Sequence, residues 1–216
     1  MALSPNQEAA LVIGQERCSF PPCRVIILAG GRSSRMGKDK AQVKVNGHRL
    51  IDLCLEQVSP LCSTPVVVSS VDLQLPREIT QVTENPPFGG PVAGISAGFY
   101  ERPDFSARND AFTAVIAVDA PLSGGFLPQL LEVLMKAPQA GVAHATIEEH
   151  TQPLLAVWRN DALHAALKSL DSPHHVAAKK LLHRCPSSVL AVVVDQCAQD
   201  YDTPEELATL GHVSLN

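Results

Sequence analysis

Short apolar runs alternate along the chain with longer segments in which apolar residues recur at helical spacing. Continuous apolar runs are typical of strands that are buried on both faces, as in a parallel sheet. The predicted strands are residues 25–29, 65–69, 81–83, 111–118, 141–145, 154–158 and 189–194. The predicted helices are residues 50–61, 92–100, 126–136, 161–169 and 176–183, and a last helix opens at Thr203 and Pro204. This alternation predicts an α/β fold with a mainly parallel sheet.

The length and composition fit one globular domain. The chain has 216 residues, of which 45% are hydrophobic and 18% charged. Because Pro21 and Pro22 mark a break before the first strand, we expect residues 1–22 to form a loosely ordered leader and residues 23–216 a single domain. The leader lacks the charge pattern and apolar run of a signal peptide, and no segment reaches about 18 apolar residues. We therefore expect a cytoplasmic protein that does not enter a membrane.

Charge and cysteine content argue against a nucleic-acid-binding protein and against a zinc protein. The formal net charge is −5 and no run of like charges occurs, which argues against a nucleic-acid partner. Any phosphate is therefore expected on a small ligand and held locally. The six cysteines show no CxxC spacing, so we expect reduced and mostly buried thiols and not a zinc site.

The segment after the first predicted strand combines glycines with cations. Its glycines are Gly30 and Gly31, and its cations are Arg32, Arg35, Lys38 and Lys40. Glycines allow a sharp turn and a close approach of backbone N–H groups to a phosphate, and ligands of open α/β sheets bind beyond the carboxyl ends of strands. The segment has neither a Walker A nor a GxGxxG motif. The structural alternative, a tight turn with solvated charges, does not explain why both features follow a buried strand. The sequence thus predicts a nucleoside-triphosphate loop.

Residues 28–40, LAGGRSSRMGKDK, resemble the nucleotidyltransferase signature LAGGxSxRMGxDK. More narrowly, the chain from Arg24 to Leu210 resembles the molybdenum cofactor guanylyltransferases, which join GMP from GTP to molybdopterin and release pyrophosphate. The resemblance implies a Rossmann-like, three-layer fold with a mixed sheet of about seven strands. It also implies that Leu28, Ala29 and Gly30 meet the base and ribose. Arg32, Arg35 and Lys40 would approach the phosphates.

Asp119 directly follows a strongly apolar predicted strand, and Pro121 then turns the chain. A carboxylate at a strand's carboxyl end, facing a phosphate loop, is a natural Mg²⁺ ligand. The matching family motif usually reads CDTP or CDMP, so Val118 and Ala120 depart from it while Asp119 is retained. The structural alternative is an aspartate that caps the next turn.

A second loop, residues 84–94, resembles the family's D/E-D-PP-x-GGPLAG segment, in which an acidic side chain reads the purine. Here Glu84 precedes Asn85, and Asn85 occupies the usual Asp position. An amide cannot accept two hydrogen bonds from guanine as a carboxylate does. Either Glu84 takes that role or the preference for guanine is weaker. Ser69 matches a position where relatives carry a nucleotide-contacting Asn, although turn chemistry alone also explains a serine at a strand end.

Two segments in the C-terminal half resemble parts of the family's acceptor site. Residues 151–155 resemble the strand that faces the acceptor, and residues 200–207 resemble the terminal NVNTPEDL motif, with Asp202 in place of Asn. A capping box at Thr203 and Glu206 is the structural alternative for that motif. The histidines at 174, 175 and 183 are expected to be solvated or to face the acceptor, and not to bind a metal. Lys179 and Lys180 could meet the pterin phosphate.

The leading hypothesis is attack of an acceptor phosphate on the α-phosphorus of GTP, with Mg²⁺ on Asp119 and with Arg35 and Lys40 stabilising the developing charge. Molybdopterin cytidylyltransferase and phospholactate guanylyltransferase activities stay open because of Asn85 and Asp202. A non-catalytic nucleotide-binding subunit is a third alternative, which the joint presence of Lys40 and Asp119 disfavours. The resemblance also allows transient contact with other proteins of cofactor biosynthesis.

Overall fold

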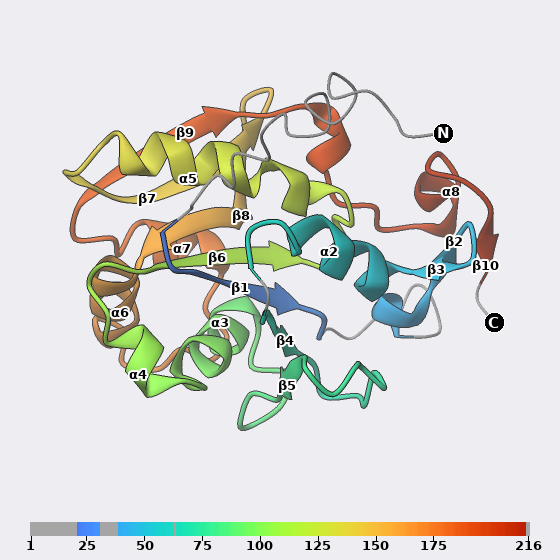
Figure 1. Cartoon of the computed structure of the whole chain (residues 1–216), viewed down its shortest axis with the longest axis horizontal. Helices are drawn as coiled ribbons and strands as arrows, with labels where there is room; N and C mark the ends of the chain where they lie inside the picture. Colours follow the sequence, from blue (N-terminus) through green and yellow to red (C-terminus); the bar gives the residue numbers. More distant parts are fainter. Residues whose placement is uncertain (1–20, 31–38, 63, 215–216) are drawn as a thin grey trace, which may run out of the picture.

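The structure is a computed structural model that describes residues 21–30, 39–62 and 64–214 (Figure 1). The predicted leader lies almost wholly outside these ranges, as do Gly31, Arg32, Arg35 and Lys38 of the glycine-rich segment. No helix among the described residues combines the length and apolarity needed to cross a bilayer.

A mixed sheet forms the middle of the molecule. Within the described residues it has seven strands in the order β5-β4-β1-β6-β8-β7-β9. These are β1 (Cys23–Leu28), β4 (Val66–Val68), β5 (Thr80–Val82), β6 (Phe112–Ala117), β7 (Ala140–Ile147), β8 (His150–Arg159) and β9 (Ser188–Val193). Among them β8 is the strand that runs opposite to its neighbours, while the other pairings are parallel. The predicted α/β class with a mainly parallel, mixed sheet is confirmed.

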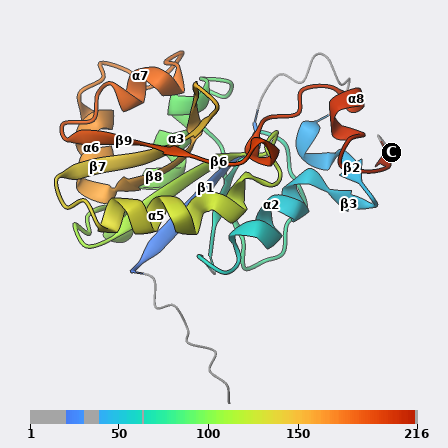
Figure 2. The same ribbon diagram turned by 90° about the horizontal axis from the view of Figure 1, so that it is seen from above.

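Helices cover both faces of this sheet, which makes three layers (Figure 2). On one face lie α2 (Leu50–Val58) and α5 (Leu127–Met135). On the other lie α3 (Pro91–Tyr100), α4 (Pro103–Ser106), α6 (Asn160–Lys168) and α7 (Ala178–Leu182). The alternation along β1 explains its apolar run, because Val25 and Ile27 pack with the first group of helices while Ile26 packs with the second. Both faces of the strand are therefore buried.

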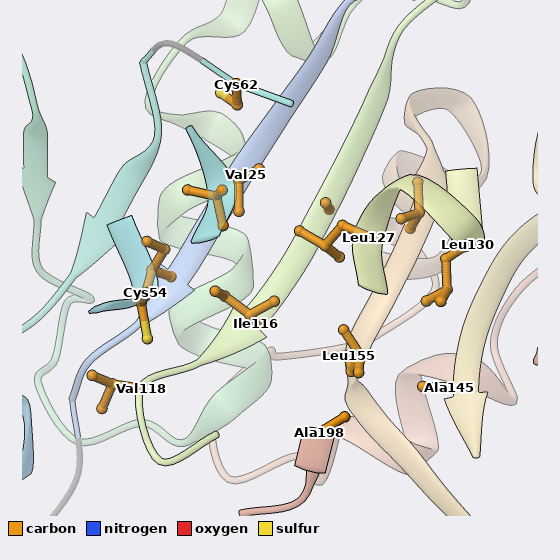
Figure 3. Close-up of a cluster of buried hydrophobic side chains, with 14 of the residues drawn as sticks. Val25, Cys54, Cys62, Ile116, Val118, Leu127, Leu130, Ala145, Leu155 and Ala198 are labelled. Carbon is orange, nitrogen blue, oxygen red and sulfur yellow. The ribbon is translucent and has the colours of Figure 1, made fainter. Parts of the chain in front are cut away.

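The larger of the two cores lies between the sheet, α2 and α5 (Figure 3). Ile116 from β6 and Leu127 from α5 both belong to this core, and both are fully buried. Ala198, from a 3-10 turn near the C-terminus (Gln196–Ala198), packs into the same core. The C-terminal segment is thus anchored on the sheet before it reaches its last helix.

A smaller sheet lies beyond the carboxyl ends of β1 and β6 (Figure 1). In the described residues it has three strands in the order β10-β2-β3. These are β2 (Lys44–Val45), β3 (His48–Arg49) and β10 (Val213–Ser214), accompanied by α8 (Pro204–Leu207) and a 3-10 turn over Lys40–Gln42. The apolar pattern did not predict this sheet, because strands of two residues carry no periodicity.

The hairpin of β7 and β8 extends beyond the predicted strands. The predicted strand 154–158 begins at His150 in the structure, and the predicted strand 141–145 continues to Ile147. Pro153 lies inside this strand although proline cannot donate to a ladder. In the structure the register of β8 shifts between Gln152 and Ala156, so Pro153 lies where the regular pairing is interrupted.

Candidate active site

Backbone hydrogen bonds fasten the carboxyl end of β1 between its two neighbours. The N–H of Ala29 donates to the carbonyl of Val68 over 2.8 Å, and the N–H of Val118 donates to the carbonyl of Leu28 over 2.9 Å. The chain leaving β1 and the chain leaving β6 therefore emerge at the same edge. Gly30, which follows, is exposed. A Cβ built there would meet its neighbours among the described residues only at 3.7 Å or more, so no close contact within that part of the chain requires this glycine.

Lys40 is the last residue of the segment 28–40, and its side chain contacts the C-terminal motif, residues 200–207. Its Nζ donates to Oδ1 of Asp202 over 3.0 Å. The side chain of Lys40 is only 12% exposed, whereas that of Asp202 is 52% exposed. Asp39 fixes the start of this turn, because its Oδ1 accepts from the N–H of Ala41. The ammonium group of Lys40 is thus held close to the sheet edge, with its ion-pair partner facing solvent.

Asp119 is joined to the same C-terminal segment. The N–H of Tyr201 donates to the backbone carbonyl of Asp119 over 2.8 Å, and Tyr201 itself is buried. Burial raises the pKa of the Asp119 carboxyl, Lys40 acts in the opposite direction, and Asp200 and Asp202 raise the pKa further. Three carboxylates and one ammonium group therefore share this region.

The predicted capping box holds the C-terminal motif in place. The hydroxyl of Thr203 accepts from the N–H of Glu206, and Oε2 of Glu206 accepts from the N–H groups of Asp202 and Thr203. These bonds use the backbone of Asp202 and leave its carboxylate for Lys40. The capping prediction is confirmed, and the same turn presents an acidic group to the site.

The donor set around Asp119 fits a hard divalent ion shared with phosphates. Mg²⁺ is usually bound through one or two carboxylates, with water and substrate phosphates completing its shell. Among the described residues no group of three or more His, Cys, Asp or Glu side chains could hold a metal without further ligands. Asp119 with the neighbouring Asp200 and Asp202 supplies carboxylate oxygens only, which suits magnesium and not zinc. An ion at Asp119 would therefore depend on nucleotide oxygens.

The second loop is shaped by Glu84. Its Oε1 accepts from the N–H of Gly89 over 3.1 Å. Its Oε2 lies 3.4 Å from where a Cβ on Gly94 would be, an ordinary contact distance, and the tighter approach there, 3.0 Å, is to Cδ2 of Leu28. Asn85 is exposed and precedes a cis peptide bond to Pro86. One oxygen of Glu84 is thus engaged within the loop, while the amide of Asn85 faces solvent.

The segment before α7 contacts this loop, and no local pattern in the chain predicts that contact. The N–H of His175 donates to the carbonyl of Gly89. The His174 ring lies directly over Gly89, since a Cβ built on Gly89 would be 2.2 Å from Nδ1 of His174. Nδ1 is buried and has no hydrogen-bond partner among the described residues. The two adjacent histidines therefore support the loop.

Ser69 lies beside the loop but its hydroxyl is used locally. It accepts from the N–H of Val71 and donates to the carbonyl of the same residue, and the side chain is 2% exposed. The turn after β4 accounts for this serine, and a contact with nucleotide stays a prediction.

The structure brings together the strand ends at Leu28, Ala29 and Gly30 on one side and Lys40 with Asp119 on the other. The predicted contributions of Gly31, Arg32 and Arg35 lie outside the described residues.

Asp119→Asn is expected to stabilise the free protein near neutral pH. Because burial raises the pKa of this carboxyl above its usual 3.8, ionisation is less favourable in the folded chain than in the unfolded one. The destabilisation is absent below the unfolded pKa, grows as the pH rises through the folded pKa, and is then fully present. Calorimetry without nucleotide or metal should show a higher unfolding midpoint for the variant at pH 7 and a difference that vanishes below about pH 4. A lower midpoint at pH 7 would contradict this placement.

Gly89→Ala is expected to disturb the second loop. The added methyl would be 2.2 Å from Nδ1 of His174 and 2.8 Å from Cβ of Ala93, so the loop must move. We expect nucleotide binding, measured by titration calorimetry, to weaken roughly tenfold, equivalent to about 1.4 kcal/mol. Adding His174→Ala should restore part of the affinity, because it removes one of the two obstacles. Unchanged affinity in Gly89→Ala would show that this loop does not touch the nucleotide.

Comparison with known proteins places these observations in a family. The model of the MobA-like NTP transferase domain matches residues 25–192. A molybdenum cofactor guanylyltransferase from Pseudomonas putida strain F1 is 29% identical over 87% of this chain and 96% of that protein. One from Ectopseudomonas mendocina is 30% identical over 87% of this chain and 90% of that protein.

Solved structures share the fold. Molybdopterin-guanine dinucleotide biosynthesis protein A from Archaeoglobus fulgidus aligns with a TM-score of 0.59 and 22% identity, covering 86% of this chain and 95% of that one. The 2-C-methyl-D-erythritol 4-phosphate cytidylyltransferase from Francisella tularensis aligns with a TM-score of 0.67 and 13% identity, covering 88% and 98%. Since the family match spans most of the strands and the residues around Asp119, the chain belongs to the family of MobA-like NTP transferase domains.

Proposed function

We propose that this nucleotidyltransferase moves GMP from GTP to the phosphate of molybdopterin and releases pyrophosphate, with Mg²⁺ as cofactor. The observation that carries the proposal is that Lys40 lies near enough to Asp119, at the sheet edge where the glycine-rich segment begins, to lower the pKa of its carboxyl. A cation and a buried carboxylate at one strand edge suit a metal-bound triphosphate. The names of the relatives support guanine as the base and molybdopterin as the acceptor.

The reaction needs no protein nucleophile. A phosphate monoester is already ionised at neutral pH, so its oxygen can attack the α-phosphorus as the bond to pyrophosphate breaks. Leu28, Ala29 and the backbone of Gly30 would position the nucleoside. Lys40, with Arg32, Arg35 and the N–H of Gly31, would offset charge on the phosphates. Asp119 would hold Mg²⁺, which when bound supplies charge neutralisation on the phosphate oxygens.

The ion pair between Lys40 and Asp202 would open when nucleotide binds. In the structure Oδ1 of Asp202 accepts one hydrogen bond from the three N–H donors of Lys40 and offsets its charge, so a phosphate that binds Lys40 would compete with this ion pair. Release of Lys40 would leave the exposed carboxylate of Asp202 beside Asp119 at the moment when the metal arrives. The aspartate at 202, where relatives usually carry asparagine, would therefore make nucleotide binding more dependent on the metal.

A second candidate is CMP transfer to the same acceptor. Oε1 of Glu84 already accepts from the N–H of Gly89, which leaves Oε2 as the oxygen of this carboxylate with both lone pairs open to a base. The exposed amide of Asn85 can donate to a pyrimidine carbonyl as readily as it can accept from a purine N–H. Against this, the GGPVAG sequence of residues 89–94 matches the guanylyltransferases better than their cytidylyl relatives.

A nucleotide-by-acceptor matrix tests the function. Purified protein is incubated with Mg²⁺ and one of GTP, CTP or ATP, with and without molybdopterin or 2-phospholactate, and pyrophosphate release is measured. We expect release with GTP and molybdopterin, and a loss of at least roughly 100-fold in Asp119→Asn. Release with CTP alone would support the second candidate. Release only with 2-phospholactate would replace the acceptor, and no release in any combination would favour a binding-only protein.

Asp202→Asn tests the competition for Lys40. Removing the carboxylate frees the ammonium group, so GTP affinity measured without divalent metal should rise about 2–5-fold, the modest value of a partly exposed ion pair. Asp200→Asn is the matched control, because it removes one negative charge near Asp119, whereas among the described residues the ion pair of Lys40 is with Asp202. Equal effects of the two substitutions would indicate general electrostatics instead of a specific pair.

A further inference from the structure

A turn that precedes α7 has an unusual backbone conformation where it meets the second loop. The turn spans residues 172–175, and within it the hydroxyl of Ser172 accepts from the N–H of His174. His175 has a φ of +58°, in the left-handed region that residues with a Cβ adopt rarely. Its side chain is exposed, so burial of the imidazole does not account for this conformation. Backbone conformations of this kind persist only where the surroundings impose them, and they are concentrated at functional sites.

The conformation of His175 provides a contact with Gly89. The N–H of His175 donates to the carbonyl of Gly89. The ring of His174 lies against the α-carbon of the same glycine, and its buried Nδ1 has no hydrogen-bond partner among the described residues, so this side of the ring acts by packing. The backbone of His175 also lies 3.9 Å from the Cβ position of Gly90, the N-cap of α3. The 172–175 turn therefore fixes residues 89 and 90 from one side.

Glu84 holds the same glycine from within the second loop. Its Oε1 accepts from the N–H of Gly89 over 3.1 Å. Both hydrogen-bonding groups of the Gly89 backbone are thus in use, one with Glu84 and the other with His175. A shift of Gly89 would change the orientation of the Glu84 carboxylate, since this carboxylate makes no other hydrogen bond among the described residues. The orientation of Glu84 consequently depends on the turn before α7, which is remote from it in the sequence.

The carboxylate that is oriented in this way lies near the end of β1. Oε2 of Glu84 is 3.4 Å and Cδ2 of Leu28 is 3.0 Å from the Cβ position of Gly94, in the first turn of α3. The proposed function places the nucleoside at this end of β1. α3 and α7 lie on the same face of the sheet and contact one another (Figure 2). The turn, the loop and the start of α3 thus form one packed unit beside the expected nucleoside.

We propose that the 172–175 turn determines base selectivity, because it aims the carboxylate of Glu84 at the N–H groups on one edge of guanine. The inference rests on the proposed function, which assigns GTP as the nucleotide. An aligned carboxylate can accept from both the ring N–H and the exocyclic amino group of guanine, and these bonds are strong because the acceptor is charged. A small rotation would break one of the two bonds, since hydrogen bonds weaken steeply with angle. His175 is thus a positioning residue that acts through Gly89 and Glu84, and its left-handed backbone matters more than its imidazole.

Two substitutions at His175 separate the backbone from the ring. His175→Gly and His175→Val both remove the imidazole, but glycine adopts a positive φ readily whereas a β-branched residue strongly disfavours it. GTP and ITP, which lacks the exocyclic amino group, are titrated into the full-length protein by calorimetry with Mg²⁺ and without acceptor. We expect the unaltered chain and His175→Gly to bind GTP at least about tenfold more tightly than ITP, as one charge-assisted hydrogen bond implies. In His175→Val this preference should fall to about twofold or less, with ITP affinity nearly unchanged.

Glu84→Gln tests whether His175 acts through the carboxylate. This variant should lose the preference for GTP over ITP, and adding His175→Val should then cause no further loss, because substitutions that act through one group are not additive. His175→Ala, which disfavours a positive φ less than valine does, should give an intermediate ratio. An unchanged ratio in His175→Val, or a ratio lost equally in His175→Gly, would overturn the inference. A parallel fall of both affinities in His175→Val would also overturn it, since that result indicates a purely structural role.

Pyrophosphate release with molybdopterin, measured on the same samples, separates this inference from the proposed function. A preference for GTP that His175→Val abolishes and His175→Gly retains, in a protein that releases no pyrophosphate, would support the inference and reject the transfer. Pyrophosphate release from GTP by a protein that binds ITP equally well would support the transfer and overturn the inference.

Discussion

The candidate site depends on how the end of β1 is fastened between β4 and β6. The N–H of Ala29 bonds to the carbonyl of Val68, and the N–H of Val118 bonds to the carbonyl of Leu28. Three chain segments must therefore leave the sheet together, and the burial of these strands on both faces keeps them from moving apart. Every other feature of the site is placed relative to this edge.

The electrostatics of the edge follow from a second constraint, the docking of the C-terminal segment. Tyr201 is buried and donates to the backbone of Asp119, which brings the carboxylates of its two neighbours close to that residue. Burial and like charge raise the pKa of Asp119, and Lys40 compensates only in part. The free protein thus keeps a poorly neutralised group of carboxylates, which a divalent ion with its nucleotide would neutralise.

The sequence predicted what depends on local pattern and failed where distant segments meet. The buried strands, Asp119 at the end of β6 and the capping box at Thr203 each follow from a few adjacent residues. Strand direction did not, because the apolar run of β8 at residues 154–158 resembles the apolar runs of β6 and β7, with which it pairs antiparallel. The ion pair between Lys40 and Asp202 joins residues 162 positions apart, and the support of Gly89 by His174 is equally non-local. Such contacts are set by packing, which leaves no periodic signal in the chain.

The central claim is that the α-phosphoryl group of a nucleotide is transferred at this edge, and label transfer measures it most directly. The protein is incubated with Mg²⁺, molybdopterin and GTP that is radiolabelled either at the α- or at the γ-phosphate. The account predicts that the α-label appears in the acceptor product and the γ-label only in pyrophosphate. Transfer of the γ-label to the acceptor, or its release as inorganic phosphate without pyrophosphate, would contradict it.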